Sequence, residues 1–180
     1  GVKSLMIFQE KSRKELLERN LRREGPIFEG DESLIWSFHD YSNFELEPLA
    51  LSRLINDNWF KKGPVSQKIV IKSFYRLQKA YLDYARTNYL GKNSLFVQVN
   101  KVEDTLFNDY HRLLLAMNGA HALRPHNRKY YFNAIEDRFE PIYYDGNLTF
   151  TSLKLPKRSD FDLLMHGPVS KDLKVRVQKL

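Results

Sequence analysis

Two short aromatic segments, residues 129–132 and 139–144, do most to restrict how this chain can fold. Both have the composition of β-strands, and only six residues, 133–138, separate them. A connection of that length is typical of a hairpin, in which the two strands run antiparallel. A hairpin also brings its outer ends together, so the residues just before 129 and just after 144 should be neighbours.

Apolar residues recur at helical spacing in two longer segments. One begins at Ser66, a plausible N-cap, and runs to about Tyr89 with a stripe of Phe74, Leu77, Tyr81 and Tyr84. The other covers 104–117 and ends at Asn118-Gly119, a pair suited to a left-handed C-cap. The spacing also predicts a helix within residues 46–60, and the loop between it and the Ser66 helix is residues 61–64.

The N-terminal part alternates strand-like and helix-like segments. A strand is predicted at 2–8. A helix should follow it, beginning with a capping box at 12–15 and ending at Gly25-Pro26. Strands are then predicted at 27–28 and 34–38, on either side of a turn at 30–31. The C-terminal part adds an extended segment at 146–156 and a short helix near 170–178. This order predicts an α+β fold with segregated elements.

Composition excludes several classes of protein. The chain has no cysteine, which excludes disulfide frameworks, thiolate zinc sites and cysteine nucleophiles. Its apolar runs are far shorter than the roughly 20 residues of a membrane span, so we expect none. The net charge of +7 is concentrated in residues 61–101, which hold nine basic side chains and one acidic one. A polyanion could bind such a segment. A helix with buried aromatics and solvated lysines explains it more simply, so we do not expect a nucleic-acid partner.

Polar residues gather in the loop before the hairpin and again after it. Asn127 precedes the first strand and Asp145 follows the second, so the hairpin should bring them together. An amide oxygen beside a carboxylate suits Mg²⁺, which takes few protein ligands and leaves the rest to water and phosphate. The residues also allow a structural explanation, because Asn before a strand and Asp-Gly at a turn are common in loops and turns of no special function.

Two separated patterns resemble the CotH-type kinases, an atypical bacterial protein kinase family associated with spore coats. The first pattern contains Gln9-Glu10, Lys14-Glu15-Leu16-Leu17-Glu18 and Arg22-Arg23-Glu24-Gly25. The second contains Asn127 with Tyr130 and Phe132, then Phe139, Pro141, Ile142 and Asp145. They occur in the family's order over residues 6–147, and the last third of the chain is only compatible with it.

The resemblance implies a protein-kinase-like fold that binds ATP and Mg²⁺ and phosphorylates Ser or Thr of a protein substrate. Residues 1–45 would be a partial N-lobe, and residues 46–180 a mainly helical C-lobe with the metal and phosphate loop at 118–147. Asn127 and Asp145 would hold the metal. The resemblance also implies that an acid of the first helix (Glu10, Glu15 or Glu18) pairs with a phosphate-binding lysine. Separately from the resemblance, Arg124 and Arg128 could hold phosphate, although arginines near acidic helices more often form solvated ion pairs.

Two departures from the family limit this expectation. The phosphate-covering loop and its lysine would lie upstream of Gly1, so the chain resembles a truncated kinase domain. The family also has a catalytic Asp in the loop before the metal Asn, whereas no acid occurs here between Asp109 and Glu136. Asn118 and His121 are nearest to that position, and His121 could serve as a base.

Three functions are therefore open: an active phosphotransferase, a catalytically inactive kinase-like scaffold that assembles cell-surface proteins, and a polyanion-binding module. The sequence is compatible with a bacterial protein of the cytoplasm or of the cell envelope.

Overall fold

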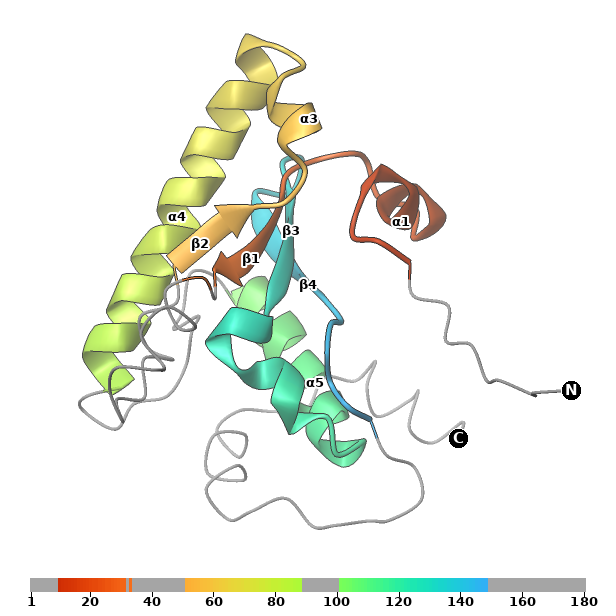
Figure 1. The fold of residues 1–180 in the computed structure, drawn as a ribbon, viewed down its shortest axis with the longest axis vertical. Coiled ribbons are helices and arrows are strands. Elements are labelled where there is room, and N and C mark those ends of the chain that lie inside the picture. The colour runs from red at the N-terminus through yellow and green to blue at the C-terminus, as the bar shows by residue number, and fades with distance from the viewer. Residues whose placement is uncertain (1–9, 32, 34–50, 89–100, 149–180) are drawn as a thin grey trace, which may run out of the picture.

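The computed structural model describes residues 10–31, 33, 51–88 and 101–148 (Figure 1). In chain order the elements are α1 (Lys14–Arg19), β1 (Ile27–Asp31), β2 (Leu51–Leu54), α3 (Asp57–Phe60), α4 (Pro64–Asn88), α5 (Lys101–Ala116), the 3₁₀ helices η2 (Ala120–Leu123) and η3 (Pro125–Asn127), β3 (Lys129–Asn133) and β4 (Arg138–Ile142). The strands predicted at 2–8 and 34–38, the helix near 170–178 and most of the extended segment at 146–156 lie outside the described residues.

The strands form one antiparallel sheet in the order β2-β1-β3-β4. This confirms the predicted α+β class. The β3–β4 hairpin is also confirmed, with Lys129 opposite Ile142 and Asn133 opposite Arg138. The predicted lobe boundary at residue 45 falls outside the described residues and stays a prediction, although β1 shares the sheet with strands from beyond that boundary.

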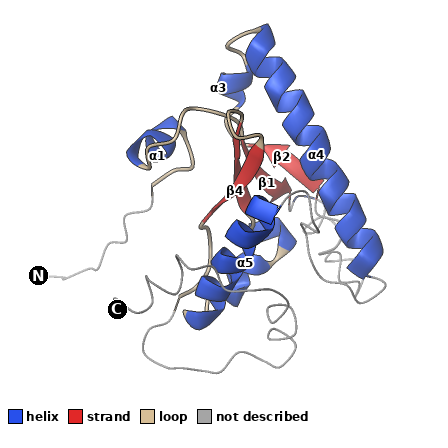
Figure 2. Ribbon diagram, turned by 180° about the vertical axis from the view of Figure 1, so that it is seen from behind, coloured by secondary structure: helices blue, strands red, loops and turns tan. Residues whose placement is uncertain are grey.

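One face of the sheet packs against α4 and carries the main hydrophobic core. Figures 1 and 2 show α4 along one side of the sheet and α1 on the other. Leu77 and Tyr81 on α4 are fully buried, as the predicted stripe requires, whereas Phe74 lies at the edge of the interface. The core cluster combines Phe28, Trp59, Val70, Leu77, Tyr81, Phe107, Tyr130, Phe132 and Phe139. Burying large aromatic and aliphatic side chains is the main source of stability in such a layer.

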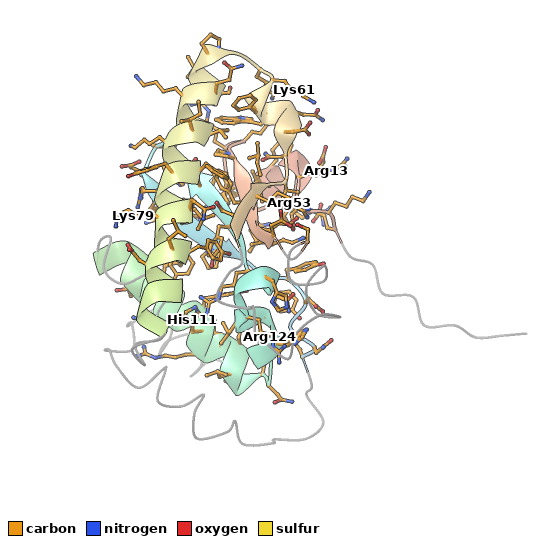
Figure 3. All side chains as sticks on the ribbon, turned by 60° about the vertical axis from the view of Figure 1, so that its left-hand side comes forward. Arg13, Arg53, Lys61, Lys79, His111 and Arg124 are labelled. Carbon is orange, nitrogen blue, oxygen red and sulfur yellow. The ribbon has the colours of Figure 1, made fainter. Side chains whose placement is uncertain are left out.

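The opposite face has a small apolar cluster and a row of charges. Leu17 of α1 packs against Ile27 and Tyr131, which are next to each other across β1 and β3. Further along the same strands, Glu29 lies opposite Arg53 of β2 and Lys129 of β3. In Figure 3, Arg13 and Arg53 lie on the side of the molecule opposite to Lys79 of α4. The face toward α1 is therefore the polar one.

Two long helices match their predictions closely. The 104–117 helix is observed as α5, and the predicted helix up to Tyr89 is observed as α4. The proposed N-cap is wrong, because α4 begins at Pro64 and places Ser66 in its first turn. Proline suits the first turn of a helix, because the N–H groups there have no partner within the helix and the N–H that proline lacks is not needed. None of the helices in the described ranges is long and apolar enough to cross a membrane.

Three local predictions are wrong. Of the helix expected at 46–60, the described residues 51–60 form strand β2 and the short helix α3 instead. Between them, Asn56 accepts from Ile27 N at 2.7 Å and donates to Gly25 O at 2.8 Å. The predicted turn at 30–31 belongs to β1, since β1 pairs with β2 as far as Asp31. The capping box is absent, because α1 starts one residue later with Arg13 at its N-cap and no side-chain cap bond.

Helix α1 ends well before the predicted Gly25-Pro26, in a Schellman turn. Leu21 N donates to Glu18 O at 3.0 Å and Arg22 N donates to Leu17 O at 2.8 Å. This places Leu21 at the position that favours glycine, with a φ of 56° and a side chain that is 90% exposed. A leucine there has backbone strain and gains no burial in return.

Replacing Leu21 with glycine should therefore raise the free energy of unfolding by about 1 kcal/mol, because glycine adopts this conformation without a steric penalty. Urea unfolding of the variant and the natural chain measures the difference. Glu15→Gly is a useful comparison, since a glycine at this exposed position of the same helix should lower stability by about 1 kcal/mol. A destabilised Leu21→Gly chain would contradict the strain argument.

Candidate functional site

The candidate site begins where α5 stops. Asn118 has a φ of 55° and donates its N–H to Leu115 O at 3.0 Å, while Gly119 N donates to Leu114 O at 2.6 Å. A Cβ on Gly119 would lie 2.6 Å from a Leu148 methyl group and 3.1 Å from the Leu114 carbonyl oxygen, so a larger residue here would require the Leu148 side chain to move. The predicted C-cap is confirmed. Asn118, offered as a catalytic residue, lies at the left-handed position of the helix stop.

Asn127 is buried at the end of the next loop and is anchored to the turn before it. Its side-chain Nδ2 donates to the backbone carbonyl of His121 at 3.1 Å, and its backbone N donates to Arg124 O at 2.9 Å. The two 3₁₀ helices η2 and η3 supply these backbone groups. With the amide nitrogen used inside the loop, the amide oxygen is the atom of Asn127 suited to a ligand.

Asp145 reaches the same loop from the far end of the hairpin. Its Oδ2 lies 3.3 Å from Nε2 of His121, and both side chains are partly exposed. Asp145 has a φ of 44°, a conformation that Asp and Asn tolerate better than most residues. Gly146 follows it and donates its N–H to the Tyr143 hydroxyl at 3.2 Å, under a ring that leaves no space for a Cβ. Asn127 and Asp145 thus both contact His121, one at its carbonyl and one at its ring.

The donor set suits a hard cation better than a transition metal. Within the part of the chain that the structure describes, no three His, Asp or Glu side chains form a metal-binding group. One amide oxygen and one carboxylate are the small protein contribution that Mg²⁺ needs when phosphate and water complete its shell. The residues present therefore fit a Mg²⁺–phosphate complex and do not fit a stand-alone metal site.

An open cleft of about 1830 Å³ is lined by Asp145; Asn127 and His121 are not among its lining residues. Its walls come from α1 and the segment before it, from β3 and β4, and from the loop 143–148 that carries Asp145. Charged side chains of both signs line it: Glu10, Lys11, Arg13, Arg22, Lys129, Glu140 and Asp145. The cleft is large enough for a nucleotide, since small-molecule sites measure about 300–1,000 Å³.

The two arginines predicted to steer phosphate differ in placement. Arg124 is exposed on the turn between η2 and η3 and is labelled in Figure 3. Arg128 points inward instead: its Nε donates to Leu123 O at 2.7 Å and its Nη1 lies 3.3 Å from Nε2 of His111. Arg128 therefore ties the loop to α5, and of the two only Arg124 is placed at the surface.

His111 is half-buried on α5, next to Arg128 and the ring of Phe107. Burial, and secondarily the positive charge of Arg128, hold the pKa of His111 well below its ordinary range. The neutral imidazole can then accept a hydrogen bond from the guanidinium, which a protonated ring could not do.

This neutral imidazole makes stability depend on pH. Below about pH 6.5 the unfolded chain protonates His111 while the folded chain does not, so the free energy of unfolding should fall as pH drops, by at most about 1.4 kcal/mol per pH unit. Urea unfolding between pH 5.0 and 7.5 measures this slope. His111→Gln should flatten it, and equal slopes in the two proteins would contradict the assignment.

The three glutamates proposed to pair with a lysine do not share one environment. Glu10 lies before α1, lines the cleft and pairs with Arg19 at 3.2 Å. Glu18 pairs with Lys14 at 3.5 Å one helical turn away, and Glu15 is exposed in the first turn. Of the three, only Glu10 reaches the cleft.

The sequence interpretation missed the charged residues of β4 and β3 that face the cleft. Glu140 is buried and accepts from Arg22 Nε at 2.6 Å and from Asn133 Nδ2 at 3.1 Å. Burial raises the pKa of Glu140, but these bonds and the charges of Arg22 and Arg138 outweigh it, so the pKa lies below its ordinary value. Arg22 and Glu140 are 118 residues apart, so no local pattern could predict their contact. The alternation of polar and apolar residues along each strand was the one sequence signal that these charged residues share a face.

Comparison with protein-family models, with curated proteins and with solved structures finds no match. The likeness to CotH-type kinases therefore rests on the two sequence motifs.

Proposed function

We propose that the chain is part of a kinase-like domain that, in the full-length protein, binds ATP with Mg²⁺ and transfers a phosphoryl group to Ser or Thr of a protein substrate. The observation that carries this proposal is that Asn127 and Asp145 both contact His121, and that Asp145 also lines a large open cleft. The CotH-like motifs contain the same two residues, which supports the proposal from the sequence independently of the geometry.

Each residue has a role in that reaction. Asn127 and Asp145 would hold Mg²⁺, which when bound offsets the negative charge of the phosphates. His121 is the group placed to accept the hydroxyl proton of the substrate, because its ring is partly exposed and Asp145 lies against its Nε2. Arg124, on the exposed turn beside them, would attract the phosphates.

An inactive scaffold is the second candidate, and one observation favours it. The loop has no carboxylate in place of the catalytic Asp, and His121 is engaged with Asp145. Such a protein would still bind Mg²⁺ and ATP but would transfer no phosphate. The polyanion alternative has less support, because Lys72 and Lys79 of α4 form ion pairs with Asp137 and Asp83 at 2.7 Å.

Calorimetric titration of the full chain with ATP tests the proposal. We expect binding in the presence of Mg²⁺ and its loss when EDTA removes the metal. Equal affinity with and without Mg²⁺, or no binding at all, would refute both kinase-like candidates. Affinity for single-stranded DNA that falls steeply with salt would favour the polyanion alternative instead.

A further inference from the structure

Lys129 lies at one end of a row of charges that crosses three strands. It is directly opposite Glu29 of β1, which is in turn opposite Arg53 of β2. The side chains of Lys129 and Glu29 are only 13% and 15% exposed, so the row is largely shielded from water on the sheet face toward α1. A charge in such a place costs free energy unless it has a partner.

The carboxylate of Glu29 is bound more closely by Arg53 than by Lys129. Arg53 donates to Oε1 from Nε at 3.0 Å and again from Nη2, whereas the Lys129 ammonium is 3.4 Å from Oε2. Charge-assisted hydrogen bonds in proteins are usually about 2.7–2.9 Å long. The contact of Lys129 with Glu29 is therefore a long ion pair that orients the ammonium and leaves its donors available.

A second contact fixes the other side of the ammonium. Lys129 Nζ lies 3.5 Å from the centre of the Tyr144 ring, in a cation–π arrangement. Tyr144 immediately precedes Asp145, so Lys129 also lies against the loop that carries the proposed metal ligand. An ammonium has three donors, and Lys129 lines the cleft that Asp145 also lines.

We propose that Lys129 contacts the phosphate chain of the nucleotide in this cleft, with Glu29 and Tyr144 orienting its ammonium. A compact cation that is held by a long ion pair and lines the cleft is suited to bind an anion of high charge density. This role rests on the proposed nucleotide site, and it adds a phosphate contact from the strand that directly follows the metal loop. The same ion pair could also have a purely structural role in the sheet. The effect of replacing Lys129 on ATP binding distinguishes the two roles.

Calorimetric titration of the full chain with ATP and with adenosine, both in Mg²⁺, tests the inference. Lys129→Met should weaken ATP binding roughly 10- to 100-fold, the effect of losing one charged contact, and leave adenosine binding unchanged. Lys129→Arg keeps the charge and should retain more affinity for ATP than Lys129→Met. The matched control is Lys72→Met, which removes another ion-paired lysine from the far side of the sheet and should not change ATP binding.

The outcomes separate this inference from the proposed function. An unchanged affinity of Lys129→Met for ATP, in a chain whose Mg²⁺-dependent binding is lost on Asp145→Asn, overturns the lysine contact alone. A natural chain that binds no ATP overturns both. Equal loss of ATP and adenosine affinity in a Lys129→Met chain with lowered thermal stability would assign Lys129 a structural role and also overturn the inference.

Discussion

Replacing Asp145 with asparagine is expected to weaken Mg²⁺-dependent ATP binding roughly 100-fold or more while the chain keeps its fold. Asparagine tolerates the left-handed backbone of this residue, so the substitution removes the charge without adding strain. A neutral amide is a poorer Mg²⁺ ligand than a carboxylate, and changes even outside the ligand shell of metal sites cost 10- to 100-fold in affinity. The side chain is partly exposed and its pair with His121 is a surface contact, so stability should change by less than about 1 kcal/mol.

The chain provides a closely matched control for this substitution. Asp137 also has a left-handed backbone, with a φ of 50°, and its exposed carboxylate is ion-paired, in this case with Lys72. It lies in the turn at the opposite end of the β3–β4 hairpin. Asp137→Asn should bind ATP as the natural chain does. Equal affinities in Asp145→Asn and Asp137→Asn, measured with Mg²⁺ present, would contradict the role of Asp145.

Replacing His121 with glutamine is expected to lower the rate of phosphoryl transfer by about 10²- to 10⁴-fold, the usual contribution of a general base. Glutamine can still donate a hydrogen bond to Asp145, but it cannot accept a proton at neutral pH. The backbone carbonyl that holds Asn127 is unaffected by the change. Binding of ATP with Mg²⁺ should therefore stay within a few-fold of the natural value.

The reaction can be followed with γ-labelled ATP and dephosphorylated casein as a general Ser/Thr acceptor. A loss of transfer without a loss of binding supports His121 as the base. Unchanged transfer in His121→Gln would contradict that role. A natural chain that binds ATP with Mg²⁺ and yet transfers nothing to casein or to itself would favour the scaffold.

Elements with a strong local signal could be predicted from the sequence. Helices α4 and α5 have apolar stripes at helical spacing, and the β3–β4 hairpin has two short aromatic strands with a short connection between them. The left-handed stop at Asn118 follows from its Asn-Gly pair. In each case the residues that decide the structure are close together in the chain.

Predictions failed where tertiary contacts outweigh local preference. Leu54 and Ile55 fit a helical spacing with Leu46, Leu49 and Ala50, but β1 needs an antiparallel partner on its free edge, and residues 51–54 provide it. A further tertiary contact holds this strand, since the backbone N and the hydroxyl of buried Ser52 both donate to Gln78 of α4. Gly30 and Asp31 likewise have turn propensity and are extended because they pair with β2.

The candidate site could be predicted only where it depends on the local β3–β4 hairpin. The hairpin topology indicated that Asn127 and Asp145 should meet, and both contact His121 in the structure. The inward direction of Arg128 and the contact between Lys129 and Glu29 could not be predicted. They depend on how α5 and β1 pack against β3, and β1 is about 100 residues away in the sequence.

The central claim is that Asn127 and Asp145 hold a metal bound to nucleotide. Substituting Mn²⁺ for Mg²⁺ tests it directly, because this paramagnetic ion broadens the NMR signals of nearby groups. In ¹H–¹⁵N spectra of the full chain, we predict that Mn²⁺ with ATP broadens the side-chain amide of Asn127 and the backbone amides around His121 and Asp145, and leaves the far turn at Asp137 sharp. Sharp signals from Asn127 and Asp145 in the presence of Mn²⁺ and saturating ATP would contradict the account.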